Sequence, residues 1–321
     1  MATISSNTYI LLACAMELGV DHPKVRDILA RLTHSVSEVN NSPNASITNT
    51  GKIRADEQVA QASEQNIRIL SPLDNEYPSL LRGMTGQPVL VWLKGALHSE
   101  PNKSIAVIGP REPTPHGDII ASRIATFFAE SGWSIVSGLA VGCDASAHKA
   151  ALDAGGHTVA VLAHGLQMVS PSVNSDLADR ILKCGGALIS QFPLGNTPIG
   201  GKQFVVRDKT QAGLSKGVVM VQSDLTGGSL HAPRAALVNG RWLIVPYPTK
   251  PDIDARAPKI SANMVIVNED QREKCHLLNC SAESLSKVVI LHGRDDYQPL
   301  LELLSDESQN EGAAEPQTDL F

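Results

Sequence analysis

Three similar units follow one another between Ser104 and Ser170, and this repetition constrains the fold more than any other feature of the sequence. Each unit has a short apolar run, over residues 105–108, 134–137 and 158–163, and each run leads into a glycine turn. Helical patterns follow the first two turns. One strand-glycine-helix unit arises often by chance, whereas three in close succession predict a doubly wound α/β sheet.

The predicted fold class is α/β, with an extended Rossmann-like, mainly parallel sheet, helices on both faces and a small N-terminal helical module. Aromatic residues make up only 4% of the chain, so the core must consist mostly of Val, Ile, Leu and Ala, as suits a parallel sheet. Loops that leave the carboxyl ends of neighbouring strands meet at one crevice, where backbone N–H groups and helix N-termini favour an anion. The sequence therefore predicts an anion-binding crevice.

The chain has 321 residues, more than one typical domain. We expect a small helical module over 1–33 and a linker with at most a partial helix over 34–66, since the linker segment has few large apolar residues. The Rossmann-like core is expected over 67–250, with a C-terminal extension over 251–304 in which no chemistry is evident. The acidic tail, 305–321, is expected to be disordered.

Charge is distributed unevenly along the chain. The formal net charge is −6, which by itself argues against a nucleic-acid partner. Residues 101–250, however, hold 13 Lys and Arg against 9 Asp and Glu, whereas residues 295–321 hold 8 acids and no Lys or Arg. A basic groove on the core is therefore compatible with the composition.

Five cysteines, an odd number at irregular spacings, indicate a reducing cytosol and not a disulfide framework. Cys275, His276 and Cys280 supply three candidate ligands without a second cluster, which does not predict zinc. The apolar run over 10–16 is too short for a signal peptide, and no run is long enough to span a membrane. We expect a cytoplasmic protein with no membrane partner, no metal and no cofactor.

Several motifs carry a family resemblance. They are Val107-Ile-Gly-Pro-Arg111 with Pro115 and Gly117, Ser137-Gly-Leu-Ala140 with Gly142, Asp144, Ala147 and His148, and Phe204, Arg207-Asp-Lys209 and Ala212-Gly-Leu-Ser215. In this order they resemble the DprA/Smf family, whose signatures read G-S-R, S-G-L-A-x-G-I-D-x-x-A-H, R-N-R-I-I-A-G-L-S and S-G-S-L. The resemblance extends from about Ile69 to Val245, over half of the chain.

The resemblance implies a DNA-processing protein of transformation and recombination, which binds single-stranded DNA and helps to deliver a RecA-type recombinase to it. It also implies a homodimer and no catalytic residue. Glycine turns and cations at helix starts are suited to hold phosphates. The candidate phosphate-binding residues are Gly109, Arg111, Ser137, Gly138, Gly142, Lys202, Arg207, Lys209, Gly228 and Ser229. Few aromatic residues lie near them, so we expect little base stacking.

This chain departs from the family signatures at four positions: Pro110, Gln191, Asp208 and His231. Gln191 replaces a carboxylate, which weakens any case for acid-base chemistry there. Asp208 adds a negative charge between two cations, so phosphate affinity is weakened or redirected. These departures leave open a divergent member with a different ligand.

Two other functions remain open from the sequence. A nucleotide-binding sensor, or a nucleotide hydrolase like the LOG-type phosphoribohydrolases, would use the same crevice. The hydrolase signature contains a glutamate that residues 227–234 lack, although Asp144 and His148 lie one helical turn apart and could share a proton. Capping and packing explain that spacing equally well. A dinucleotide oxidoreductase is disfavoured, because no G-x-G-x-x-G lies between Gly109 and Gly117.

The final residues, Gln317-Thr-Asp-Leu-Phe321, resemble the peptide with which bacterial proteins bind the sliding clamp, Q-L-[S/D]-L-F. A disordered terminus can insert two apolar side chains into a pocket of a partner. Gln317, Asp319, Leu320 and Phe321 match the pattern, and Thr318 departs from it. Five residues are a short motif, and a chance match is the alternative.

Overall fold

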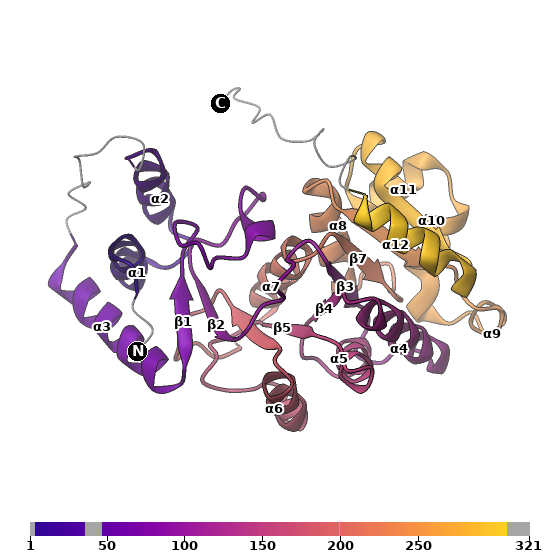
Figure 1. The fold of residues 1–321 in the computed structure, drawn as a ribbon. Coiled ribbons are helices and arrows are strands. Elements are labelled where there is room, and N and C mark those ends of the chain that lie inside the picture. Colours follow the sequence, from indigo (N-terminus) through magenta and orange to yellow (C-terminus); the bar gives the residue numbers. More distant parts are fainter. Residues whose placement is uncertain (1–3, 36–46, 199, 307–321) are drawn as a thin grey trace.

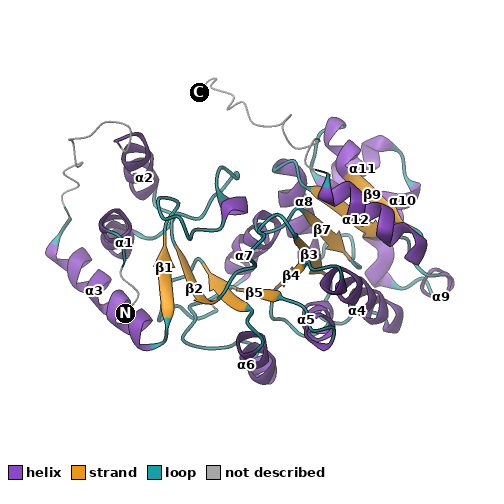
Figure 2. Ribbon diagram, in the orientation of Figure 1, coloured by secondary structure: helices purple, strands orange, loops and turns teal. Residues whose placement is uncertain are grey.

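The computed structural model describes residues 4–35, 47–198 and 200–306. In these residues nine strands form one sheet, in the order β1-β2-β6-β5-β4-β3-β7-β8-β9. Neighbouring strands from β6 to β9 are parallel, and β1 and β2 extend the sheet antiparallel at one end. Helices lie on both faces (Figures 1 and 2). The predicted fold class is confirmed.

The inner strands consist mainly of aliphatic and small residues, and every residue of β3 to β8 is buried. Burial on both faces explains why these runs show no alternation of apolar and polar residues. The strands are β1 Ile67–Leu70, β2 Val91–Gly95, β3 Ser104–Ile108, β4 Ser134–Ser137, β5 Thr158–Leu162, β6 Ala187–Ser190, β7 Gly217–Met220, β8 Trp242–Pro246 and β9 Val288–Leu291.

The sheet is wound in two directions from its middle. The chain proceeds from β3 outward through β4, β5 and β6, and then returns to place β7 on the other side of β3, followed by β8 and β9. The point between β3 and β7, where the winding reverses, is the topological switch point. In open α/β sheets ligands bind at this point, outside the carboxyl ends of the strands.

Two layers of helices cover the sheet. One face packs against α7 (Gly201–Gly213), α8 (His231–Val238), α10 (Ser261–Asn268) and α11 (Gln271–Leu278). The other face packs against α4 (Pro115–Glu130), α5 (Cys143–Asp153), α6 (Ser175–Lys183) and α12 (Tyr297–Ser305). The short helix α9 (Lys250–Asp254) follows β8. Residues 251–304 thus add an edge strand and helices to the sheet of the core.

The N-terminal part corrects the predicted linker. Beside α1 (Ser6–Leu18) and α2 (Pro23–Ser35), residues Asn49–Glu64 form a third helix, α3. Its buried face carries Gly51, Ala55 and Ala62, and a Cβ added at Gly51 would lie 2.6 Å from the carbonyl oxygen of Ala13 in α1. Small residues let the two helices approach closely, which is why the segment lacks the large apolar residues of an ordinary amphipathic helix.

The start of α5 determines where Asp144 lies. Gly142, with φ 79°, occupies the N-cap position, and Asp144 lies in the first turn of the helix. The Asp144 carboxylate therefore faces the loops at the carboxyl end of the sheet.

Among the described residues, none of the helices combines the length and the apolar character that a membrane span requires. The acidic tail beyond Asp306 lies outside the described residues.

Candidate functional site

A cavity of about 430 Å³ opens at the switch point, between the loops that follow β3 and β7. We call it the cleft. Five of the predicted phosphate-binding residues line it: Gly109 and Arg111 after β3, Arg207 on α7, and Gly228 and Ser229 after β7. Residues that are far apart in the sequence thus meet at the edge of the sheet where an anion-binding site was expected.

The other five predicted residues have different positions. Lys202 and Lys209 are exposed on α7 and do not line the cleft. Ser137 is fully buried, and its hydroxyl donates a 2.6 Å hydrogen bond to the carbonyl oxygen of Val107. A Cβ at Gly142 would overlap the Arg111 carbonyl, so this glycine lets two loops pack together.

Arg207 lies in the wall of the cleft, paired with two carboxylates. Its Nε is 2.9 Å from Oδ1 of Asp208, and its Nη1 is 3.5 Å from Oδ2 of Asp144. All three side chains are at most 13% exposed. The Arg207 charge is therefore balanced within the protein before any ligand arrives, unlike the charge of a free phosphate-binding arginine.

The carboxylates of this group have raised pKa values. Burial raises the pKa of Asp208 to about 6, and Arg207 opposes the shift without cancelling it. Asp144 adds to the shift, because two carboxylates that share one guanidinium repel each other. Burial likewise raises the pKa of Asp144 above its usual value, again against the effect of Arg207.

Gly138 is the residue that makes room for this ion-pair cluster. A Cβ at this position would overlap both Nη1 of Arg207 and Oδ2 of Asp144. Gln211 completes the enclosure when its amide is oriented to satisfy both neighbours: the nitrogen then donates to Oδ1 of Asp208 over 3.1 Å, and the oxygen accepts the N–H of Gly138. The glycine signature at 138 therefore serves a side-chain cluster, and its N–H group is already engaged.

Arg111 is the lining cation that forms no ion pair with a described residue. Its guanidinium carbon lies 5.3 Å from the ring centroid of Phe204, and that of Arg207 lies 5.9 Å from the same centroid. Phe204 is half-buried and also lines the cleft. The sequence predicts few aromatic residues near the crevice, and Phe204 is one that does line it, from the first turn of α7.

Asp144 and His148 do not share a proton. The His148 ring is completely buried, with Nδ1 2.7 Å from Oγ1 of Thr158 and Nε2 against the carbonyl oxygen of Gly138. Burial lowers the pKa of His148 to about 4, so the ring is neutral near pH 7. It ties α5 to β4 and β5, which is the structural role that the sequence left open.

The sequence did not single out two of the charged residues of the cleft. Lys259 reaches it from the C-terminal extension and lies 3.3 Å from Asp224, which also lines it. No motif marks Lys259, since only the return of the chain past β8 brings it to this edge. With Arg111, Arg207, Asp144 and Asp208, the charged lining side chains number three cations and three anions.

Two further departures from the signatures have clear positions. His231 lines the cleft, and burial, Arg234 and Lys209 all lower its pKa. Gln191 is buried outside it and accepts a 2.7 Å hydrogen bond from Thr210. Within the described residues, no group of three or more His, Cys, Asp or Glu side chains is arranged to hold a metal ion.

The fold and the cleft define an α/β protein of the Rossmann-like class with a cavity at its switch point. A family model described as DNA recombination-mediator protein A matches residues 68–270. The chain belongs to that family, and the resemblance to DprA/Smf signatures is confirmed.

Curated relatives agree with this assignment. Protein Smf of Escherichia coli is 40% identical over 56% of this chain and 48% of its own length. The DNA processing protein DprA of Bacillus subtilis is 33% identical over 57% of this chain and 61% of its own length. The chain thus matches about half of the length of these relatives.

Two solved structures share the fold. DprA from Streptococcus pneumoniae superposes with a TM-score of 0.63 at 25% identity, covering 84% of this chain and all of that one. DprA from Helicobacter pylori, in a study of its single-stranded DNA binding mode, gives a TM-score of 0.58 at 22% identity, covering 75% of this chain and 98% of that one.

Proposed function

We propose that this protein binds single-stranded DNA in the cleft and acts in DNA recombination. The observation that carries the proposal is the convergence of Arg111, Phe204 and the Gly228 turn at the switch point. A cation, an aromatic ring and a glycine turn are the groups that a DNA strand needs for its phosphates and bases. The family, and the subject of the H. pylori structure, support the same ligand.

In the proposed complex the roles of the candidate residues differ. Arg111 contacts a phosphate, since it forms no ion pair with a described carboxylate. Backbone N–H groups of the Gly109 and Gly228 turns add hydrogen bonds to phosphate oxygens. The exposed Lys202 and Lys209 attract the strand from outside the cleft, and Arg207 supports the site from its ion pairs with Asp144 and Asp208.

The balance of charge favours a DNA strand over a free nucleotide. The charged side chains that line the cleft are three cations and three anions. The cleft therefore has no net positive charge to compensate the clustered negative charges of a nucleoside triphosphate. A phosphodiester strand carries one charge per nucleotide and spreads it along the chain. We therefore place the nucleotide-binding sensor second, supported only by the shape of the site.

A nucleotide hydrolase is the weaker form of this alternative. The pair that would have supplied acid-base chemistry, Asp144 and His148, is engaged elsewhere: Asp144 with Arg207, and His148 with Gly138 and Thr158. Residues 227–234 contain no glutamate. We propose a binding protein in which no residue reacts.

The wider role follows from the family. We propose that the protein presents bound DNA to a RecA-type recombinase and that it acts as a homodimer. We place this activity in the cytoplasm, since all five cysteines are free and reducing compartments keep thiols unpaired.

A binding titration tests the proposal. Short single-stranded oligonucleotides and, separately, mononucleotides are titrated onto the full chain at two salt concentrations. We expect the oligonucleotide to bind, with an affinity that falls with salt and tolerates sequence, and the mononucleotides to bind far more weakly. Equal or tighter binding of a mononucleotide would favour the sensor.

We also propose that Gln317, Asp319, Leu320 and Phe321, which lie outside the described residues, bind the bacterial sliding clamp. Deletion of residues 319–321 should abolish retention of the protein on immobilised clamp, and the melting temperature and oligonucleotide affinity should not change. Undiminished retention would make the match a coincidence.

A further inference from the structure

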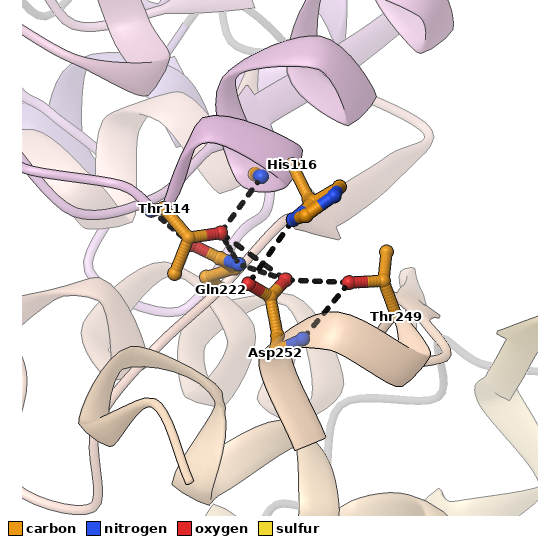
Figure 3. Close-up of polar contacts among 6 residues, drawn as sticks. Thr114, His116, Gln222, Thr249 and Asp252 are labelled. Carbon is orange, nitrogen blue, oxygen red and sulfur yellow. Dashed lines mark hydrogen bonds and ion pairs between the residues drawn. The ribbon is translucent and has the colours of Figure 1, made fainter. Parts of the chain in front are cut away.

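A cluster of hydrogen bonds centres on Asp252 and joins Thr114, His116, Gln222 and Thr249 (Figure 3). The Asp252 carboxylate is 7% exposed and accepts four side-chain donors. Oδ2 lies 3.1 Å from Oγ1 of Thr114, 2.8 Å from Oγ1 of Thr249 and 3.4 Å from Nε2 of Gln222. Oδ1 lies 3.3 Å from Nδ1 of His116. None of these residues lines the cleft.

The cluster fastens three segments that meet only in the folded protein. Thr114 is the N-cap of α4, Gln222 follows β7, and Asp252 is in the first turn of α9. Gln222 accepts the N–H of Thr114 over 3.0 Å and donates to its hydroxyl over 2.8 Å. A Cβ at Gly117 would overlap the Gln222 amide, so this glycine admits the amide between α4 and β7.

The hydrogen bonds of Thr114, Thr249 and Gln222 in the cluster have defined directions, whereas the role of His116 Nδ1 follows its tautomer. The Thr114 hydroxyl accepts from Gln222 and from the N–H of Gly117, so its single proton is directed to Asp252. All four side chains around Asp252 act as donors, and both of its oxygens must accept. An asparagine at 252 would keep the three donors at Oδ2 only by turning its NH₂ group toward Nδ1 of His116, whose ring would have to change tautomer to accept it. It would also lose the negative charge that strengthens all four hydrogen bonds, and the cluster would hold the loop less firmly.

The Arg111 loop, residues 109–114, runs from the end of β3 to Thr114. At its β3 end the carbonyl oxygen of Pro110 accepts the N–H of Cys143 over 3.3 Å. At its α4 end the Thr114 N–H and hydroxyl are held by Gln222 and Asp252. Between these anchors Arg111 forms no ion pair with a described residue, so the backbone of the loop fixes where its guanidinium can reach.

We propose that Asp252 is a positioning residue for Arg111: it anchors the far end of the loop and holds the guanidinium where a DNA phosphate binds. This inference rests on the proposed function. It assigns a role in DNA binding to a residue that does not line the cleft and that comes from the C-terminal extension of the core.

A double-mutant cycle tests the inference. Arg111→Ala, Asp252→Asn and the double variant are titrated with a fluorescent oligothymidylate across a salt series. Arg111→Ala should weaken binding roughly tenfold and lower the salt slope by about one, the effect of one lost phosphate contact. Asp252→Asn should lower affinity and slope in the same direction, and should add little when Arg111 is already alanine.

Asp74→Asn is the matched control. Asp74 also accepts several hydrogen bonds, from Ser5, Thr8 and Ser71, but in the N-terminal part of the chain. Asp74→Asn should lower the stability of the protein without changing its affinity for oligothymidylate or the salt slope of binding. Thr249→Val, which removes a single donor to Asp252, serves if Asp252→Asn does not fold, and should give a smaller loss that also disappears in the Arg111→Ala background.

The outcomes separate the inference from the function on which it rests. If Arg111→Ala leaves binding unchanged, the proposed DNA site is wrong. If Arg111→Ala weakens binding but Asp252→Asn and Thr249→Val do not, or if their losses persist in full without Arg111, then Asp252 is only a structural residue and the inference fails.

Discussion

Nε of Arg207 lies 2.9 Å from Oδ1 of Asp208 in the wall of the cleft. The Arg207 guanidinium is therefore already paired with a carboxylate of the protein. The family signature has an asparagine at the position of Asp208. Because an aspartate is negative only when ionised, the charge of the cleft in this chain depends on pH. The Asp208 carboxyl group faces Arg207, Asp144, Arg111 and the Gln211 amide.

The first prediction concerns the pH dependence of DNA binding. The pKa of Asp208 is raised to about 6, so the carboxyl is ionised at pH 7.5 and protonated at pH 5. Protonation removes a negative charge from the cleft, and affinity for oligothymidylate should therefore rise as pH falls through about 6. We expect a gain of roughly three- to tenfold, about 1 kcal/mol, measured by fluorescence anisotropy at constant ionic strength.

Asp208→Asn should bind tightly at both pH values and flatten most of this profile. Asp153→Asn, which changes the net charge equally but affects an exposed pair with Arg180, should retain the wild-type profile. His231 also lines the cleft and charges at low pH, so the comparison is repeated with His231→Gln in both proteins. A profile that survives Asp208→Asn would exclude Asp208 as its source.

The second prediction concerns stability. The pKa of Asp208 is higher in the folded protein than the ordinary aspartate value of 3.8, so the folded state binds this proton more tightly than the unfolded state. Its contribution to the free energy of unfolding is present below pH 4 and is lost as pH rises through about 6. Asp208→Asn should therefore gain stability relative to wild type between pH 4 and pH 7.

Urea denaturation at several pH values measures this difference. Other titrating groups, such as His148 with its lowered pKa, contribute to both proteins and largely cancel in the comparison. A constant difference between the two proteins across this range would show that Asp208 has no raised pKa.

The third prediction separates the two arginines of the cleft. Arg207→Ala leaves Asp144 and Asp208 buried without their cation, which typically costs about 3–5 kcal/mol. Arg111→Ala breaks no ion pair and should change the free energy of unfolding by less than about 1 kcal/mol. The two variants should thus differ sharply in thermal denaturation. Equal melting temperatures would contradict the assigned roles.

The fourth prediction compares two glycines of the cleft region. Gly138→Ala would place a Cβ against Arg207 and Asp144 and should destabilise the protein by at least about 2 kcal/mol, because an ion-pair cluster must move. Gly228→Ala meets no heavy atom within 4 Å and has no positive φ, so its stability should stay within about 0.5 kcal/mol of wild type. Chemical denaturation of both variants measures the contrast.

The sequence predicted the sheet because its signals are local. Each of the strands β3, β4 and β5 is a short buried run followed directly by a glycine turn, and such units can form an open sheet in few ways. The sequence predicted only a linker with a partial helix where α3 lies, since the contact of α3 with α1 uses Gly51, Ala55 and Ala62, which resemble the composition of a linker. A helix contact made by glycine and alanine leaves little hydrophobic pattern in the sequence.

The site was predicted in its residues but not in its electrostatics. Arg111, Arg207 and Gly228 do line one cavity. The ion pair of Arg207 with Asp144, 63 residues away in the sequence, depends on how α7 rotates against α5, which no periodicity specifies. Lys259 and Asp252 were missed for the same reason: the returning chain brings them to this edge of the sheet, and no motif surrounds them.

The fifth prediction concerns Phe204, whose ring lies in the cleft beneath two guanidinium groups. A base that stacks on this ring should contribute about 1–3 kcal/mol. Phe204→Leu should therefore weaken binding of oligothymidylate, and Phe204→Tyr should retain most of it. The leucine variant also removes the surface beneath Arg111, so an oligonucleotide of abasic sites is titrated in parallel. If the ring stacks on a base, wild type should prefer the normal strand to the abasic strand, and Phe204→Leu should lose that preference. If the leucine variant only removes the support of Arg111, it should weaken binding of both strands alike.

The matched control is Tyr247→Leu, at an exposed aromatic residue that does not line the cleft. This variant should leave the preference for the normal strand intact.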